Sequence, residues 1–221
     1  MMQQWKRSMW AALLTLATLF SFTGCSSSES SVDLSNIASA MITEGTTEAL
    51  TTDYAYIMND DGTISVSGYT GSDTDLTVPG LIDGYVVTGI ADHAFEANAD
   101  IKSITLPNGL IAIGESAFSD CSSLTTVVIP DTVGTIRRGA FISCTALTTL
   151  DIPASVTEIM EEAFTGCAAL KDLTIESSTV EFTNWWVDTD EIPSDLTITC
   201  PKDSKIAAWA EKNNVATEPL S

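Results

Sequence analysis

One repeated segment constrains this chain more than any other feature of its sequence. Residues 101–169 contain three consecutive copies of a 23-residue unit, which begin at Ile101, Leu124 and Leu147. A unit that recurs at a period between 20 and 50 residues cannot bury its apolar face alone and must stack on its neighbours. The sequence therefore predicts a repeat solenoid in which residues 23 positions apart lie above one another.

Equivalent positions of the three units form columns. The apolar columns, which predict the core, are Ile101/Leu124/Leu147, Ile104/Val127/Leu150, Leu106/Ile129/Ile152, Leu110/Val133/Val156, Ile113/Ile136/Ile159 and Phe118/Phe141/Phe164. The other constant columns are Pro107/Pro130/Pro153, Ala117/Ala140/Ala163 and Cys121/Cys144/Cys167. Apolar and polar residues alternate at the start of each unit, which predicts a short strand that ends at the proline. For the remainder of the unit we expect extended backbone and one tight turn.

The unit resembles the leucine-rich repeat of BspA-like bacterial surface proteins, whose pattern is roughly LxxLxIPxxVxxIxxxAFxxC. The resemblance covers about residues 54–215, and period, proline, Ala-Phe pair and cysteine recur together. It implies a right-handed leucine-rich-repeat superhelix with one short strand per unit plus a turn or short helical leg. It also implies adhesion and protein interaction. The asparagine of the commoner leucine-rich repeat is missing, so no ligand geometry is carried over.

The N-terminal part of the chain has the pattern of an export signal and a tether. In residues 1–24, Lys6 and Arg7 precede a short apolar run, and the segment ends before Cys25. This pattern predicts a lipoprotein signal peptide with Cys25 as the lipidated residue. An ordinary signal peptide or a short membrane anchor is the alternative. Residues 25–52 are rich in serine, threonine and acid, which predicts a flexible tether.

Both ends of the repeat array deviate from the unit in ways that predict caps. Residues 53–73 alternate around Asp60-Asp61-Gly62, which predicts a β-hairpin, with calcium ligation by the aspartates as the alternative. The solenoid is expected over residues 74–200, with an insertion at 80–86 that serves either for capping or for contact. Residues 201–221 predict a short helical cap and a tail.

The last units contain two adjacent tryptophans. Counting onward by the repeat period places Trp186 in the alanine column and Val187 in the phenylalanine column. Such an exchange of large and small residues keeps the volume and predicts that Trp186 packs in the core. An exposed Trp185-Trp186 platform for a sugar or a peptide is the alternative interpretation.

The charge of the chain restricts its partners. The net charge is −21, and removal of residues 1–24, which contain Lys6, Arg7 and no acid, makes it two units more negative. Nucleic acid and anionic lipid headgroups both need a basic surface, so neither is expected as a partner. Membrane contact is expected only through the lipid at Cys25, and the folded part is expected to be a monomer.

The sequence contains no recognisable catalytic or metal-binding motif. His93 is the only histidine, and it occupies a variable position of the unit. We therefore expect no catalytic residue, no metal and no cofactor. With thirty acids in the chain, an acid/base glycan-processing enzyme stays open as an alternative. Cys121, Cys144 and Cys167 are expected to form a buried column of free thiols, with Cys167 and Cys200 as the best pair if a disulfide forms.

The outward positions of the predicted strands offer an extended polar surface. We expect candidate ligand-binding residues at Ser103, Thr105, Thr126, Val128, Thr149, Asp151, Asp172 and Thr174. Solenoids bind through such continuous surfaces, although threonine is also favoured in any strand that faces water. The hypothesis is a surface lipoprotein that binds an extracellular protein or glycan. A passive structural spacer without a ligand is the alternative.

Overall fold

The structure, a computed structural model, describes residues 53–186 and 192–220. The predicted signal segment, Cys25 and the predicted tether lie outside these residues. The described residues belong to one compact unit, Thr46–Ser221. In this described part, no helix is long and apolar enough to cross a membrane.

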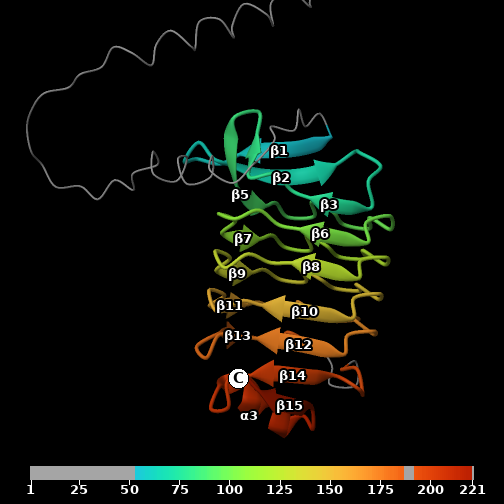
Figure 1. The fold of residues 1–221 in the computed structure, drawn as a ribbon, viewed down its shortest axis with the longest axis vertical. Helices are drawn as coiled ribbons and strands as arrows, with labels where there is room; N and C mark the ends of the chain where they lie inside the picture. The colour runs from blue at the N-terminus through green and yellow to red at the C-terminus, as the bar shows by residue number, and fades with distance from the viewer. Residues whose placement is uncertain (1–52, 187–191, 221) are drawn as a thin grey trace, which may run out of the picture. The chain divides into compact units, whose positions relative to one another are not determined.

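Each repeat forms one turn of a solenoid, called a rung below, and contributes two short strands (Figure 1). The first strands are β3 (Asp75–Thr77), β6 (Ser103–Thr105), β8 (Thr126–Val128), β10 (Thr149–Ile152), β12 (Asp172–Ile175) and β14 (Thr197–Cys200). The second strands are β5 (Tyr85–Ile90), β7 (Ala112–Ile113), β9 (Thr135–Ile136), β11 (Glu158–Ile159) and β13 (Glu181–Phe182). The predicted solenoid is therefore confirmed.

Within the regular units the strands pair in the predicted 23-residue register, whereas β3 pairs with β6 at a separation of 28 residues and β12 with β14 at 25. Counting on by 23 places Leu196 opposite Leu173, and this is wrong, because Ile198 lies there. Ser103 lies opposite Thr126, and Glu158 lies opposite both Thr135 and Glu181. The second leg is extended as expected, but it also pairs as a strand, which adds a strand to the one predicted per unit. Two-residue strands are too short to show an alternating pattern in the sequence. The sheets run in the orders β1-β2-β5-β7-β9-β11-β13 with β4 on β5, β3-β6-β8, and β10-β12-β14-β15.

The predicted apolar columns form the core. The rings of Phe95, Phe118, Phe141 and Phe164 stack with centroid separations of 5.2, 5.4 and 6.1 Å and interplanar angles of 4°, 6° and 13°. Each of these side chains is buried. The Phe118 amide also donates to the Ala140 carbonyl of the next rung at 2.8 Å. Neighbouring rungs are thus joined both by ring stacking and by backbone hydrogen bonds.

Two columns that flank the Ala-Phe pair adopt a left-handed backbone. The first consists of His93, Ser116, Gly139 and Glu162, with φ between 51° and 62°, and the second of Ala97, Asp120, Ser143 and Gly166, with φ between 57° and 74°. Only one glycine occurs in each column, although glycine is the residue that adopts this conformation without steric cost. These two turn positions therefore leave no recognisable sign in the sequence.

The N-terminal end of the solenoid is capped by a hairpin. Strands β1 (Tyr54–Met58) and β2 (Ile64–Tyr69) pair antiparallel, and β2 continues into the solenoid by pairing with β5. The turn contains Gly62 at φ 84°. The hydroxyl and the amide of Thr63 donate to the Asp61 carboxylate and lower its pKa. Asp61 therefore has a structural role in the turn.

The insertion at 80–86 packs on this hairpin. Strand β4 (Leu81–Ile82) pairs antiparallel with the start of β5, and Asp83 and Gly84 form the turn with φ of 51° and 83°. The Tyr56 hydroxyl donates to Asp83 at 2.9 Å, which raises the pKa of Tyr56. These contacts favour the capping interpretation of the insertion.

The C-terminal end contains the predicted short helix. Helix α3 (Lys205–Lys212) begins after Ser204, whose hydroxyl accepts a hydrogen bond from the Ala207 amide at 3.1 Å. Ile206 and Ala210 are buried against the last rung. The predicted tail is not irregular, because β15 (Ala216–Pro219) pairs parallel with β14 and extends the sheet by one strand.

Candidate functional site

The structure brings all eight predicted binding residues together on the outer face of the first-strand sheets. Two columns share this face, called the sheet face below. In the first, Ser103 lies opposite Thr126 and Thr149 lies opposite Asp172. In the second, Thr105 lies opposite Val128 and Asp151 lies opposite Thr174. Figure 1 shows β10 following β8 in the same stack of strands.

The sheet face is longer than the sequence prediction. Asp75 pairs with Ser103 at one end, and Thr197 pairs with Asp172 at the other. These flanking positions were not predicted. Both lie where the chain departs from the 23-residue period, since Asp75 and Ser103 are 28 residues apart and Asp172 and Thr197 are 25 apart. The neighbours of an inward residue on a strand point outward, so alternation within each strand is the signal that could have identified them.

The sheet face is polar and accessible. Ser103 and Thr174 are half-buried, and the other six candidate residues are exposed. The Ser103 hydroxyl donates to the Asp75 carboxylate at 2.5 Å, so part of the hydrogen-bonding capacity is used within the face. Val128 is 50% exposed and is the one large apolar group of the set. The arrangement offers hydroxyl and carboxylate groups on rungs spaced about 4.8 Å apart.

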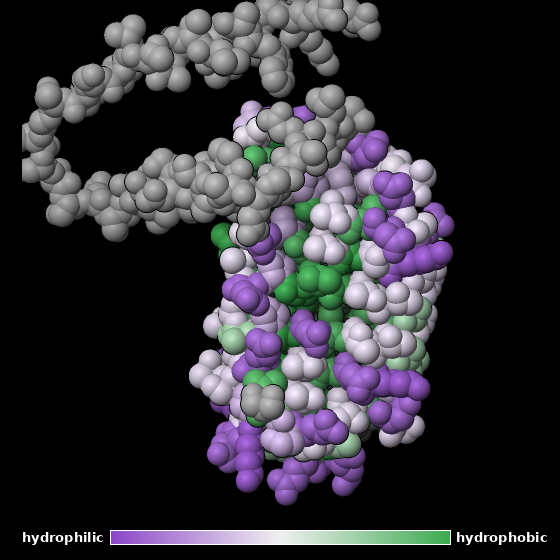
Figure 2. Space-filling model, in the orientation of Figure 1, coloured by the Kyte–Doolittle hydropathy of each residue, from purple (hydrophilic) through white to green (hydrophobic). Residues whose placement is uncertain are grey.

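Hydrophobic groups are also exposed on the solenoid. Figure 2 shows hydrophobic side chains along the middle of the face it presents, with hydrophilic side chains towards both margins. An extended ligand on a surface of this kind would meet polar and apolar groups together, as in most non-obligate protein interfaces.

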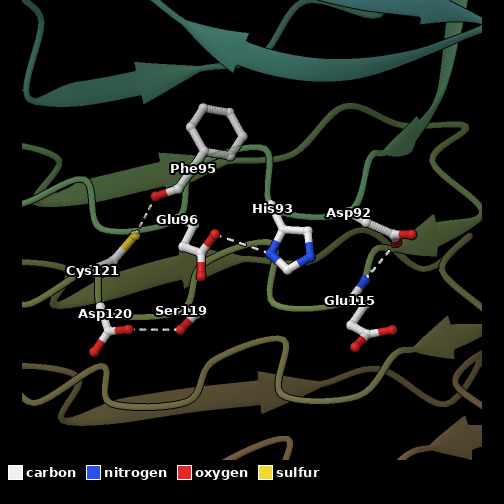
Figure 3. Close-up of polar contacts among 8 residues, drawn as sticks. All are labelled: Asp92, His93, Phe95, Glu96, Glu115, Ser119, Asp120 and Cys121. Carbon is white, nitrogen blue, oxygen red and sulfur yellow. Dashed lines mark hydrogen bonds and ion pairs between the residues drawn. The ribbon is translucent and has the colours of Figure 1, made fainter.

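The two residues that could support nucleophilic chemistry are directed apart (Figure 3). The imidazole of His93 pairs with Glu96 at 3.0 Å, and the thiol of Cys121 donates to the Phe95 carbonyl at 3.1 Å. Burial raises the pKa of Cys121 to about 12. A reactive cysteine needs a lowered pKa, so the environment of Cys121 is the opposite of an activated thiol.

All four described cysteines are free and buried, including Cys200 and its candidate partner Cys167. Burial raises the pKa of Cys167 to about 12 and also raises that of Cys144. In the described residues, no group of three or more His, Cys, Asp or Glu side chains could hold a metal ion.

The tryptophans are core residues, but not in the predicted columns. Trp185 and Trp186 are 1% and 5% exposed, which excludes an exposed platform. The Phe141 amide donates to the Ala163 carbonyl, whereas the Phe164 amide donates to the carbonyl of Trp185, one position earlier than the repeat phase requires. The chain is one residue shorter here, so Trp185 and not Trp186 takes the alanine position. Val187, predicted in the phenylalanine column, lies outside the described residues.

A cavity of about 390 Å³ lies beside these tryptophans, between the last complete rung and α3. Its walls include Phe182, Trp186 and Trp209, and Asn184 and Asn213 lie among its polar lining. No pattern in the sequence indicates this cavity, because it arises only where α3 packs on the rung.

Together, the stacked rungs and the flat outer sheet define a leucine-rich repeat solenoid. Six copies of the repeat that defines the family of BspA type leucine-rich repeat regions match this sequence within residues 87–195. The chain belongs to this BspA-type leucine-rich repeat family. No curated protein matches the sequence.

Solved bacterial leucine-rich repeat proteins are similar in structure. A leucine-rich repeat protein of T. pallidum is 25% identical, with a TM-score of 0.63, over 69% of this chain and 71% of its own. A leucine-rich repeat protein from Bacteroides capillosus is 31% identical, with a TM-score of 0.51, over 59% of this chain and 97% of its own. A leucine-rich cell surface protein from Faecalibacterium prausnitzii is 31% identical, with a TM-score of 0.56, over 73% of this chain and 45% of its own. This chain thus spans less than half of the last protein.

Proposed function

We propose that this protein is a non-enzymatic surface lipoprotein whose sheet face binds an extracellular protein or glycan. The observation that carries the proposal is the alignment of eight outward residues in two columns over four consecutive rungs. A flat surface of repeated hydroxyl and carboxylate groups suits an extended ligand, because each rung presents a similar set of groups.

Export and anchoring are part of the proposal. Residues 1–24 have the charged start and apolar run of a signal peptide, and Cys25 is the lipidated residue. The relative from Faecalibacterium prausnitzii, described as a cell surface protein, supports a surface location. We expect fatty-acid labelling of the full chain in a bacterial host, and loss of the label in Cys25→Ala. A labelled Cys25→Ala variant would contradict the anchoring.

A charge-reversal variant tests the sheet face. Thr126, Thr149 and Asp151 are exposed and point away from the core. Their joint replacement by lysine should abolish saturable binding of the protein to cells, since it places three cations in the middle of an uncharged and acidic surface. The melting temperature should stay within a few degrees, because no buried group is changed.

A matched control uses the other sheet. Joint replacement of Thr135, Thr157 and Glu158 by lysine gives the same change in net charge on the second-strand side. This control should keep cell binding. Equal loss in both variants would indicate a general charge effect, and unchanged binding in the first variant would exclude the sheet face.

A further inference from the structure

The N-terminal end of the solenoid has an open sheet edge. Figure 1 shows β1 at the opposite end of the stack of strands from α3, and among the described residues β2 is the only strand that pairs with β1. The Asn59 amide donates to the Thr63 carbonyl across the hairpin at 2.9 Å. Hydrogen-bonded and non-hydrogen-bonded residues alternate along an antiparallel strand, so the backbone groups of Tyr56 and Met58 point away from β2. These outward groups are called the β1 edge below.

Two further observations support this direction. The carbonyl of Val66, which lies opposite Tyr56, accepts a hydrogen bond of 2.8 Å from the Ala91 amide and therefore points away from β1. The bulge of the hairpin places its extra residue, Ser67, in β2, so β1 keeps a regular alternation. The β1 edge can thus offer the amides and carbonyls of alternate residues to another strand.

The two ends of the solenoid differ in how their edge strands are protected. Charged residues and proline commonly prevent an edge strand from pairing with another chain, and β15 contains Glu218 and Pro219. Strand β1, with the sequence YAYIM, contains neither. The end that carries β1 is also the more apolar. Four of the seven exposed large hydrophobic side chains of the described residues lie on β1, β4 or the start of β5: Ile57, Met58, Leu81 and Tyr85.

The charge around the β1 edge favours a cationic partner. Residues 53–90 contain six acids and no lysine, arginine or histidine. Asp53 precedes β1, and Asp60 and Asp61 follow it, so acids flank both ends of the strand. A third acid, Asp83, accepts a hydrogen bond from the hydroxyl of Tyr56 within β1.

Neither the preceding segment nor a second copy of the chain matches this charge. Residues 25–52 contain four acids and no basic residue, so they add to the negative charge instead of balancing it. Pairing of β1 with β1 of a second copy would bring two sets of the same acids together, which like-charge repulsion opposes.

We propose that the β1 edge binds a short extended segment of a cationic protein as an additional strand. The segment pairs its backbone with Tyr56 and Met58, and its apolar side chains pack beside those of Ile57 and Met58. Lysine or arginine residues at the two ends of the segment lie near the acids that flank β1. Because β1 has five residues, the paired segment is about as long. This surface is separate from the sheet face and does not depend on the function proposed for that face.

A designed peptide tests the chemistry of the partner. A capped, fluorescently labelled peptide of sequence KKVTVTVKK, titrated with the chain from Cys25 onward in a non-ionic detergent, should show saturable binding by anisotropy. Binding should weaken at high salt. The same peptide with glutamate in place of lysine, and KKVTVTVKK with N-methyl groups on its central amides, should each bind at least about 10-fold more weakly. Absence of saturable binding, or equal binding of either control peptide, would overturn the proposal.

Proline variants assign the binding to the β1 edge. Met58→Pro removes an outward amide and keeps the hydrogen bonds to β2. Thr217→Pro is the matched control at the other end of the solenoid. The Leu220 amide donates to the Cys200 carbonyl of β14, so alternation directs the Thr217 amide away from β14. Met58→Pro should weaken peptide binding about 10-fold, and Thr217→Pro should leave it unchanged.

Two outcomes of this comparison would overturn the proposal. Equal peptide binding by Met58→Pro and Thr217→Pro would place the peptide elsewhere on the acidic surface. A concentration-dependent dimer of the unchanged chain in sedimentation, lost in Met58→Pro, would show that a second copy occupies the edge. Thermal unfolding checks that both variants fold. Should Met58→Pro fail to fold, the N-methylated peptide on the unchanged chain still decides whether a strand is added.

Discussion

The thiol of Cys144 donates a hydrogen bond of 3.1 Å to the backbone carbonyl of Phe118, in the preceding rung. Cys121 and Cys167 make the same contact with the carbonyls of Phe95 and Phe141. The cysteine column, predicted as buried small hydrophobic groups, therefore also provides hydrogen bonds between rungs. Each thiol gives a second hydrogen bond to a carbonyl that already accepts one from the amide three residues later in the chain, and a carbonyl oxygen has two lone pairs for this purpose.

Alkaline pH should destabilise the protein through this column. Burial raises the pKa of Cys121 and Cys167 to about 12, above the ordinary value of 9.0. The unfolded chain releases these protons at lower pH than the folded chain, so stability is unaffected below about pH 9 and falls above it. Each thiol lowers the free energy of unfolding by at most about 1.4 kcal/mol per pH unit. Urea unfolding at pH 8, 9 and 10 measures the fall.

A variant isolates the contribution of one thiol to this pH dependence. Cys144→Ala should be less stable than the original protein at pH 8, by about 1–2 kcal/mol, because a buried hydrogen bond and packing are lost. Its stability should nevertheless decrease less between pH 9 and pH 10. The same decrease in both proteins would show that the thiols do not cause it.

The thiols should be inaccessible in the folded protein. A chain that starts at residue 26 contains only Cys121, Cys144, Cys167 and Cys200, all of them buried. A thiol reagent such as DTNB should react slowly with the native chain and should count four thiols in denaturant, with or without prior reduction. A count of two before reduction would reveal a disulfide.

Gly114 should not tolerate a side chain. A Cβ atom at this position would lie 2.5 Å from the Ala91 carbonyl carbon and 2.6 Å from the Asp92 nitrogen. Gly114→Ala should therefore destabilise the protein by about 1–3 kcal/mol or more, because backbone atoms must move. Gly134 is the control, since its Cβ would have no neighbour nearer than 3.8 Å. Gly134→Ala should cost less than about 1 kcal/mol in urea unfolding, and equal losses would contradict the predicted clash.

The left-handed turn positions should be open to stabilisation. Ala97 is exposed and has φ 57°. Ala97→Gly should raise the free energy of unfolding by up to about 1 kcal/mol, because relief of the left-handed strain exceeds the added entropy of the unfolded chain. Ala168 is exposed and has no positive φ, so Ala168→Gly should lower stability. Thermal unfolding compares the two variants, and destabilisation by both would disprove the strain.

The repeat could be predicted from the sequence because its columns have one physical cause. Residues such as Phe118 and Phe141 recur at 23 positions because each packs on the next. The second strand was not predicted, since Ala112–Ile113 is too short to show a period. The tryptophan positions were assigned wrongly because one residue is missing before Trp185, and counting cannot detect a deletion that only hydrogen bonds reveal.

The sheet face and the cavity beside α3 also differ in how far the sequence predicts them. The outward direction of Thr126 and Thr149 follows from strand alternation, whereas the binding role of the sheet face stays a prediction. The cavity depends on contacts between Trp186 and Trp209, which are one repeat period apart but belong to a rung and a helix of different geometry. No pattern along the chain indicates how a capping helix packs.

Cross-rung pairing also fixes how this protein can change in size. Neighbouring parallel strands are spaced about 4.8 Å apart. Each 23-residue unit, such as residues 124–146, adds one rung and therefore one such spacing to the length of the solenoid. Duplicating that stretch would lengthen the molecule by about 4.8 Å and extend both outward columns by one residue, while the hairpin and α3 would stay at the ends. The length of the solenoid can therefore change only in steps of one rung, and the number of repeat units sets it.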